Sequence, residues 1–279
     1  MEINGKAIAR TIIESLQKLP KPEKSLAAIF VGDNAQSQSF LKQKEKIANE
    51  LGIIFQLHRF PETISEKDLI THIKNIGDDD MVGGMIVQLP LPATLNRDTV
   101  ISAINPSKDV DALTFASQKL VDPLPVAVVK DILKNQNIDI TNKIVVVVGR
   151  GFLVGKPIAD YFNTKCKELI VLHSKSDLSD LKNGDIVITG VGKGGLITPE
   201  MLKSGACVID FGYDIKEVKS EKGKVESKIV GDFNPMSHVA SHMSQVSGWY
   251  TPTPGGTGPI LVAEIFKNFY CLSKESSEL

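Results

Sequence analysis

Short runs of Val, Ile and Leu alternate along the chain with longer segments in which apolar residues recur at helical spacing. Unbroken apolar runs joined by helical crossovers are typical of parallel strands covered on both faces. The pattern predicts strands at residues 26–31, 53–58, 84–88, 143–149, 169–173, 185–189 and 207–210. It predicts helices at the N-terminus and near residues 36–51, 65–76, 127–135, 155–163, 199–203 and 259–272. We therefore expect an α/β fold with parallel sheets.

A Pro-rich stretch, VDPLPV at residues 121–126, separates two such series of strands and helices. A chain of 279 residues is long for one hydrophobic core but sufficient for two lobes. We expect an N-terminal α/β domain over residues 1–121 and a Rossmann-like domain over residues 122–258.

Charge and cysteine content argue against several classes of protein. A net charge of −1 gives no reason to expect nucleic acid or an anionic membrane as a partner. The cysteines, Cys166, Cys207 and Cys271, stand far apart without metal-ligand spacing, as suits a reducing compartment. No segment resembles a signal peptide or a membrane span, so we expect a soluble, cytoplasmic protein. His238 and His242 lack the glutamate of a zinc-protease motif, so we expect surface histidines and no metal.

The strand expected at residues 143–149 runs into a glycine-rich loop that contains Gly149, Arg150, Gly151 and Gly155. Glycines at a strand-to-helix turn let backbone amides approach a pyrophosphate, which the helix N-terminus then stabilises. The GxGxxxG spacing is one residue longer than the usual fingerprint. Its position after the most hydrophobic strand indicates a dinucleotide site.

The next strand distinguishes NADP from NAD. An NAD site usually places an acid at this strand's end, but here the strand ends in His173, Ser174 and Lys175. Arg150, Ser174 and Lys175 are suited to a 2′-phosphate, which favours NADP. In the alternative interpretation, Ser174 or Ser176 caps a short helix and Lys175 is solvated.

A further strand leads into a loop that contains Val191 and Gly192 together with three other glycines and a lysine. Such glycine density at the carboxyl end of a parallel strand suits a nicotinamide or ribose passing close to the backbone. The alternative is a plain flexible turn.

Lys44 lies on the apolar stripe of the helix expected at residues 36–51, four residues after Phe40. Burial would lower the pKa of Lys44 and make it a usable acid or base, whereas snorkelling at the stripe's edge is the commoner outcome. Gln88 follows a parallel strand and could hydrogen-bond Lys44 or a substrate. Asp109 and Asp111 could pair with a polar heterocycle, but the sequence pattern favours solvated loop charges.

Taken together, these motifs resemble the bifunctional methylenetetrahydrofolate dehydrogenase/cyclohydrolase family over essentially the whole chain. The order of VQLPLP and PGGxGP around a glycine-rich loop is highly specific. The segments that carry the resemblance are SQSFLKQK at 37–44, VQLPLP at 87–92, KDVD at 108–111, VVGRGFLVGKP at 147–157, HSKS at 173–176, VGD at 230–232 and TPTPGGTGP at 251–259.

The resemblance implies NADP-dependent oxidation of methylenetetrahydrofolate to the methenyl form, then hydrolysis to formyltetrahydrofolate, in one-carbon metabolism. It implies that Lys44 is catalytic, that Gln88 tunes it and that Asp111 binds the pterin. It also implies a homodimer, and a C-terminal helix, with residues 259–279, that returns to the first lobe. The folate-binding residues it implies are Phe40, Lys44, Gln88, Leu89, Asp111, Pro254, Gly255 and Gly256. The implied NADP-binding residues are Gly149, Arg150, Gly151, Val154, Gly155, His173, Ser174, Lys175, Val191, Gly192, Asp210, Gly212, Gly231, Asp232 and Thr257.

Several positions depart from the family pattern. Phe40 stands where Tyr is usual, Ala112 where Gly is usual, and Thr257 where Val is usual. Residues 122–127, DPLPVA, replace a PCTPxG segment, and Ile-Leu at 260–261 replaces Met-Thr. These departures leave two alternatives: a dehydrogenase with reduced or lost cyclohydrolase activity, or a non-catalytic protein that binds NADP or folate.

Overall fold

The computed structural model describes residues 1–219, 225–236 and 248–273. It divides into two compact units. Unit 1 comprises Met1–Ile8 and Pro125–Leu261, and unit 2 comprises Ala9–Leu124 and Val262–Leu279. His238 and His242, considered above for metal binding, lie outside the described residues.

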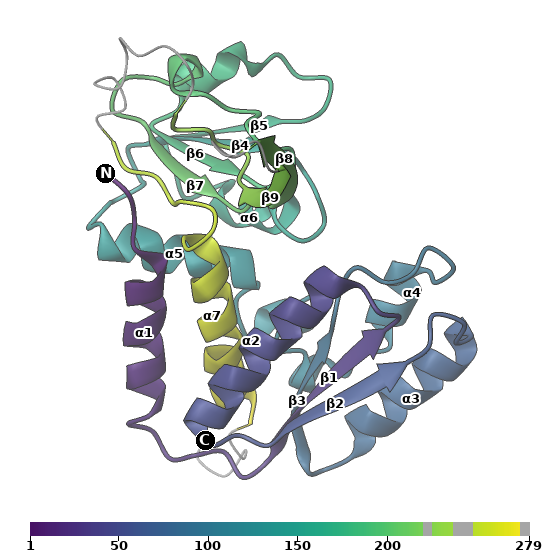
Figure 1. Cartoon of the computed structure of the whole chain (residues 1–279). Coiled ribbons are helices and arrows are strands. Elements are labelled where there is room, and N and C mark those ends of the chain that lie inside the picture. Colours follow the sequence, from purple (N-terminus) through teal and green to yellow (C-terminus); the bar gives the residue numbers. More distant parts are fainter. Residues whose placement is uncertain (220–224, 237–247, 274–279) are drawn as a thin grey trace. The chain divides into compact units, whose positions relative to one another are not determined.

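Unit 2 is built on a parallel sheet with the strand order β2-β1-β3 (Figure 1). The strands are β1 (Ser25–Val31), β2 (Phe55–Phe60) and β3 (Val82–Val87). The sequences of β1 and β3, SLAAIFV and VGGMIV, are buried throughout. FQLHRF in β2 is only partly buried.

The helices of unit 2 follow their sequence signals closely. In α2 (Ala35–Leu51), the Asn34 side chain accepts a hydrogen bond from the Ser37 amide, and the helix ends at Gly52 with a φ of 70°. Ser65 caps α3 (Glu66–Asp78) in the same way. The remaining elements are α4 (Arg97–Ser102), the 3-10 turns η1 (Pro106–Lys108) and η2 (Ser117–Lys119), and most of α1 (Gly5–Leu16) and α7 (Thr257–Leu272).

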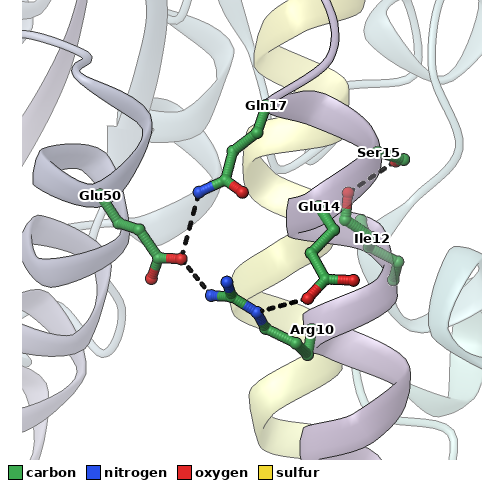
Figure 2. Close-up of polar contacts among 6 residues, drawn as sticks. All are labelled: Arg10, Ile12, Glu14, Ser15, Gln17 and Glu50. Atoms are coloured by element: carbon green, nitrogen blue, oxygen red, sulfur yellow. Dashed lines mark hydrogen bonds and ion pairs between the residues drawn. The ribbon is translucent and has the colours of Figure 1, made fainter.

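Within unit 2, α1 and α2 are joined by side chains at the surface (Figure 2). Arg10 donates to Glu14 at 2.9 Å and also to Glu50, while Gln17 donates to the same Glu50 carboxylate at 3.3 Å. Such exposed ion pairs contribute at most about 1 kcal/mol, so burial of the apolar faces is the main source of stability.

Unit 1 contains a parallel sheet with the strand order β5-β4-β6-β7. Its strands are β4 (Ile144–Val148), β5 (Glu168–Leu172), β6 (Ile186–Thr189) and β7 (Cys207–Asp210). The core on this sheet includes Val146, Leu181, Val187, Ile197 and Val208. The helical elements are α5 (Leu124–Asn135), α6 (Gly155–Phe162), η3 (Leu178–Asn183) and η4 (Pro199–Met201).

The prediction of an α/β fold with parallel sheets and a Rossmann-like unit is confirmed, and every predicted strand is present within two residues of its expected bounds. The sequence pattern did not predict one hairpin and one short helix. The antiparallel hairpin β8 (Asp214–Lys219) and β9 (Val225–Val230) has charged strands, DIKEVK and VESKIV, rather than apolar runs. Helix α4 is short and depends on its Asn96 cap. The helix predicted at 199–203 is only the 3-10 turn η4.

Among the described residues, no helix combines the length and apolar character that crossing a bilayer requires.

Candidate active site

Lys44 is a buried lysine of α2, with 8% of its surface exposed. Its Nζ donates a hydrogen bond of 2.9 Å to Oε1 of Gln88, the residue that follows β3. Gln88 is itself oriented, because its Nε2 donates to the Leu89 carbonyl at 2.7 Å and its backbone amide donates to Ile29 at 2.9 Å. Lys44 therefore does not snorkel: its ammonium is turned into unit 2 and held by one amide oxygen.

Asp111 provides the charge that acts on Lys44. Burial lowers the pKa of Lys44, and the negative charge of Asp111 partly opposes that effect. Burial raises the pKa of Asp111 to about 6, with the Lys44 charge lowering it and the Asp109 charge raising it. Both groups are thus shifted towards neutrality, as is common among acids and bases that exchange protons near neutral pH.

The segment that carries Asp111 is fixed from within unit 2. Asp109 is fully buried, and its Oδ2 accepts hydrogen bonds from the Thr114 amide at 2.9 Å and the Ser117 hydroxyl at 2.8 Å. Asn268 of α7 donates to the Val110 carbonyl at 2.9 Å. The expectation of solvated loop charges is wrong for Asp109, because Thr114 and Ser117 supply hydrogen bonds to its Oδ2 that offset part of the cost of burial.

Sequence reasoning missed Asn268, although its signal resembles that of Lys44. It is a polar residue in the apolar helix α7, and it is 5% exposed. Its Nδ2 also donates to the Asp122 carbonyl at 3.1 Å. The Asn268 side chain therefore connects the backbone at Val110 with the backbone at Asp122.

The other predicted folate-binding residues fall in both units. Phe40, one helical turn before Lys44, and Leu89, next to Gln88, are partly exposed in unit 2. Pro254, Gly255 and Gly256 belong to unit 1, where Gly255 has a φ of 103° and the Gly256 amide donates to Pro252 at 2.8 Å.

In unit 1, the glycine loop between β4 and α6 is shaped by close backbone contacts. Gly149 has a φ of 89°, which favours glycine. A Cβ on Gly155 would lie 1.9 Å from the Gly149 carbonyl oxygen, so this position accepts no side chain.

A Cβ on Gly151, by contrast, would meet no atom within 4 Å, and Arg150 is exposed. Val154 packs against Gly190 of the neighbouring loop, where a Cβ would come within 2.6 Å of the Val154 side chain. This leaves an open backbone surface at the start of α6, as a pyrophosphate requires.

His173, Ser174 and Lys175 follow β5 and are exposed. Ser176 accepts a hydrogen bond from the His173 amide at 3.0 Å, and Asp177, not a serine, caps the following turn η3. The structure therefore contradicts the alternative in which Ser174 or Ser176 caps a short helix. The strand end carries hydroxyl and ammonium groups but no acid.

The remaining predicted cofactor residues lie near the ends of β6 and β7. Val191 is 45% exposed, and Gly192 has a φ of 76°. Asp210 and Asp232 are buried; Gly212 follows Asp210 by two residues, and Gly231 directly precedes Asp232. Thr257 donates to the Asp210 carbonyl at 2.9 Å. Both carboxylates are therefore enclosed within unit 1.

A parallel sheet with a glycine loop at its carboxyl edge, and a second α/β unit with a buried lysine, define an α/β protein of the dinucleotide-binding class. Residues 3–111 match the catalytic-domain model of tetrahydrofolate dehydrogenase/cyclohydrolase, and residues 123–277 match its NAD(P)-binding domain. The chain belongs to the tetrahydrofolate dehydrogenase/cyclohydrolase family, as its motifs indicated.

Individual relatives agree with this assignment. The chain is 34% identical to the bifunctional protein FolD of Staphylococcus carnosus, over 95% of this chain and 94% of that protein. It is similar to the Campylobacter jejuni bifunctional enzyme FolD, a methylenetetrahydrofolate dehydrogenase/cyclohydrolase, with a TM-score of 0.84, 31% identity and 98% of each chain covered. It is also similar to Trypanosoma brucei FolD complexed with NADP and inhibitor, with a TM-score of 0.87, 27% identity and coverage of 100% and 99%.

Proposed function

We propose that this chain oxidises methylenetetrahydrofolate with NADP and hydrolyses the methenyl product to formyltetrahydrofolate. The observation that carries the proposal is the buried Lys44–Gln88 hydrogen bond of 2.9 Å beside Asp111, in a chain of this family. A structural protein has little reason to bury an ammonium group with a single amide partner, because its desolvation is costly. Perturbed acids and bases of this kind cluster at catalytic sites.

We assign folate binding to residues 1–121 with 259–279, and NADP binding to residues 122–258. Phe40 would stack on the pterin ring, and its lack of a hydroxyl leaves this stacking intact. Asp111, as a carboxylate, would accept hydrogen bonds from the N–H groups of the pterin. Leu89 and the loop of Pro254, Gly255 and Gly256 would complete the folate contacts.

The residues of unit 1 fit NADP. The open surface at Gly151 and the start of α6 provide amides for the pyrophosphate, and Arg150, Ser174 and Lys175 provide donors for a 2′-phosphate. When bound, NADP supplies the hydride acceptor. The chain contributes placement: Val191 and Gly192 would line the nicotinamide end, and Val154 and His173 would border the nucleotide.

Hydrolysis would depend on Lys44. With its pKa lowered by burial, the Lys44 amine can accept a proton from the water as the water oxygen bonds to the methenyl carbon. It can return that proton to the ring nitrogen as the bond between this nitrogen and the carbon breaks, and the second proton of the water is released to solvent. Gln88 holds Nζ in one place, which limits the motions that would lose this geometry.

We further propose that the protein is a cytoplasmic homodimer. The family resemblance supports the dimer, and the free Cys166, Cys207 and Cys271 are compatible with a reducing compartment. Light scattering would decide the mass: a monomer at micromolar concentration would contradict the dimer.

The test compares wild type with Lys44→Met and Lys42→Met, an exposed lysine on the same helix. NADPH formation and methenyl absorbance are followed with methylenetetrahydrofolate as substrate. We expect wild type and Lys42→Met to form formyl product, and Lys44→Met to lose roughly 100-fold or more of the hydrolysis rate. Wild-type protein that stalls at the methenyl stage would support the dehydrogenase-only alternative. Binding of NADP without turnover would overturn the enzymatic assignment.

A further inference from the structure

Two aspartates of unit 1, Asp210 and Asp232, are buried at the carboxyl edge of the sheet, with exposures of 1% and 0%. Asp210 is the last residue of β7, and Asp232 follows β9. Buried carboxylates are costly unless every oxygen has partners. The partners here show what these residues do.

Asp232 binds the loop that follows β6 at three points. Its Oδ2 accepts hydrogen bonds from the Thr189 hydroxyl and the Val191 amide, each at 2.7 Å. Its Oδ1 accepts a hydrogen bond from the Lys193 amide, also at 2.7 Å. A single side chain thus fixes every second amide of a glycine-rich loop. Glycine loses more conformational entropy on folding than other residues do, so such a loop needs these hydrogen bonds to be ordered.

The side chains of Asp210 and Asp232 each occupy space that a glycine of the other segment leaves open. A Cβ on Gly231 would lie 2.1 Å from Oδ2 of Asp210, and a Cβ on Gly212 would lie 2.4 Å from Cγ of Asp232. Asp210 in turn accepts hydrogen bonds from the Gly212 amide at 2.6 Å and the Phe233 amide at 2.9 Å. Each acid therefore packs against the glycine beside the other acid, which leaves little room for Asp232 to move.

The direction of the hydrogen bonds limits what the loop can bind. With the amides of Val191 and Lys193 turned inward to a carboxylate, they are not available to a phosphate, unlike the amides at Gly151. A fixed negative charge beneath the loop repels an anion and favours a cation above it. The oxidised nicotinamide ring is a cation, whereas the reduced ring is neutral.

We propose that Asp232 is a positioning residue for the nicotinamide end of NADP, which fixes residues 189–193 and favours the oxidised ring over the reduced ring. The inference rests on the proposed binding of NADP by unit 1. Burial raises the pKa of Asp210 to about 7, and the Asp232 charge adds to that effect.

The experiment measures the Kd of NADP and of NADPH by calorimetry in the absence of folate, for wild type, Asp232→Asn and Thr189→Val. Asp232→Asn removes the charge and one acceptor, so we expect NADP to bind roughly tenfold more weakly, with a smaller loss for NADPH. Thr189→Val removes one hydroxyl and keeps the charge, so we expect roughly threefold losses that are alike for both forms.

Asp185→Asn is the matched control, because Asp185 precedes β6, at the opposite end of the strand, where it accepts a hydrogen bond from the Ile144 amide at 2.9 Å. It should change stability without changing the ratio of the two Kd values. Equal losses for NADP and NADPH in Asp232→Asn, or no loss, would overturn the inference. If Asp232→Asn does not fold, unchanged dinucleotide binding in Thr189→Val would overturn it.

The same variants separate this inference from the proposed function. Hydrolysis of added methenyltetrahydrofolate needs no dinucleotide, so the control Asp185→Asn should retain it. A wild-type protein that binds neither dinucleotide would contradict the proposed function itself. A wild type that binds NADP and turns over, with an unchanged Kd ratio in Asp232→Asn, would contradict only the role of Asp232.

Discussion

The candidate sites of the two units are built from different parts of the chain. In unit 2, the chemistry belongs to side chains: Lys44, Gln88 and Asp111 come from a helix, a strand end and a loop. In unit 1, the ligand surface belongs mainly to backbone, exposed where Gly149 and Gly155 allow close approach. In unit 1, the carboxylate of Asp232 accepts hydrogen bonds from backbone amides. In unit 2, Asp111 and Lys44 instead shift each other's pKa.

This difference determines which substitutions each site tolerates. A backbone site fails when a side chain is added, because there is no space for the new atoms. A side-chain site fails when a charge is removed, and the fold itself can then become more stable, because the burial of an ionised group is no longer needed. Stability and activity should therefore be lost together where the backbone site of unit 1 is closely packed, as at Gly155, and should change in opposite directions in unit 2.

The largest effect is expected from adding a methyl group to unit 1. In Gly155→Ala, the new Cβ would lie 1.9 Å from the backbone oxygen of Gly149, which cannot rotate away as a flexible side chain would. We expect a loss of about 3 kcal/mol in the free energy of unfolding, together with loss of NADP binding. Urea denaturation and calorimetry measure the two effects.

Gly151→Ala, in the same loop, is its control. No atom lies within 4 Å of the new Cβ, so stability should stay within about 0.5 kcal/mol of wild type. NADP binding should still weaken, because the methyl group projects into the space assigned to the pyrophosphate. Unchanged NADP affinity in Gly151→Ala would show that the dinucleotide phosphates lie elsewhere.

A smaller effect, of opposite sign for stability, is expected from Asp111→Asn in unit 2. Loss of one charge-assisted hydrogen bond to the pterin, about 2 kcal/mol, should lower kcat/KM for the folate roughly thirtyfold. In wild type, kcat/KM should fall as the pH decreases through about 6, where the Asp111 carboxylate takes up a proton. This acidic limb should be absent from the variant.

Linkage gives the stability of the same variant. The folded state raises the pKa of Asp111 above its ordinary 3.8. The contribution of this group to the free energy of unfolding is therefore fully present at low pH, and it is lost as the pH rises through about 6. Asp111→Asn avoids that loss, so it should be more stable than wild type at neutral pH. Equal thermal midpoints at pH 7 and a retained acidic limb would show that Asp111 is not the titrating group.

The comparison also explains how much of the molecule could be predicted from its sequence. The strands were predictable because runs such as IVVVV in β4 leave few alternatives to a buried parallel strand. The glycine loop was predictable because close backbone approach requires glycine at fixed spacing. The hairpin β8–β9 was not, because its charged strands have no apolar run.

The side-chain site was only partly predictable. Lys44 was visible because a helix has a fixed period, which places the lysine on the apolar stripe. The burial of Asp109 was not visible, because it depends on hydrogen bonds from Thr114 and Ser117 that form only once the loop has folded. Periodicity identifies the face of an element, but it does not identify the partners that a loop residue acquires.

The smallest effect is expected at Ala112, next to Asp111, where the family usually has glycine. Ala112 has a φ of 51°, a conformation that costs a residue with a Cβ about 1–2 kcal/mol. Ala112→Gly relieves that cost but loses a buried methyl group and adds chain entropy to the unfolded state, each worth up to about 1 kcal/mol. These effects nearly cancel, so stability should change by no more than about 0.5 kcal/mol and activity should be retained.

Ala116→Gly is the control for this substitution, since Ala116 is exposed and has an ordinary φ of −72°. With no strain to relieve, this variant should lose about 0.5–1 kcal/mol, measured by urea denaturation beside Ala112→Gly. If Ala112→Gly is as destabilised as Ala116→Gly, Ala112 is not strained. If Ala112→Gly instead gains several-fold in kcat/KM for the folate, the alanine displaces Asp111, and this departure from the family pattern weakens the side-chain site without affecting the fold.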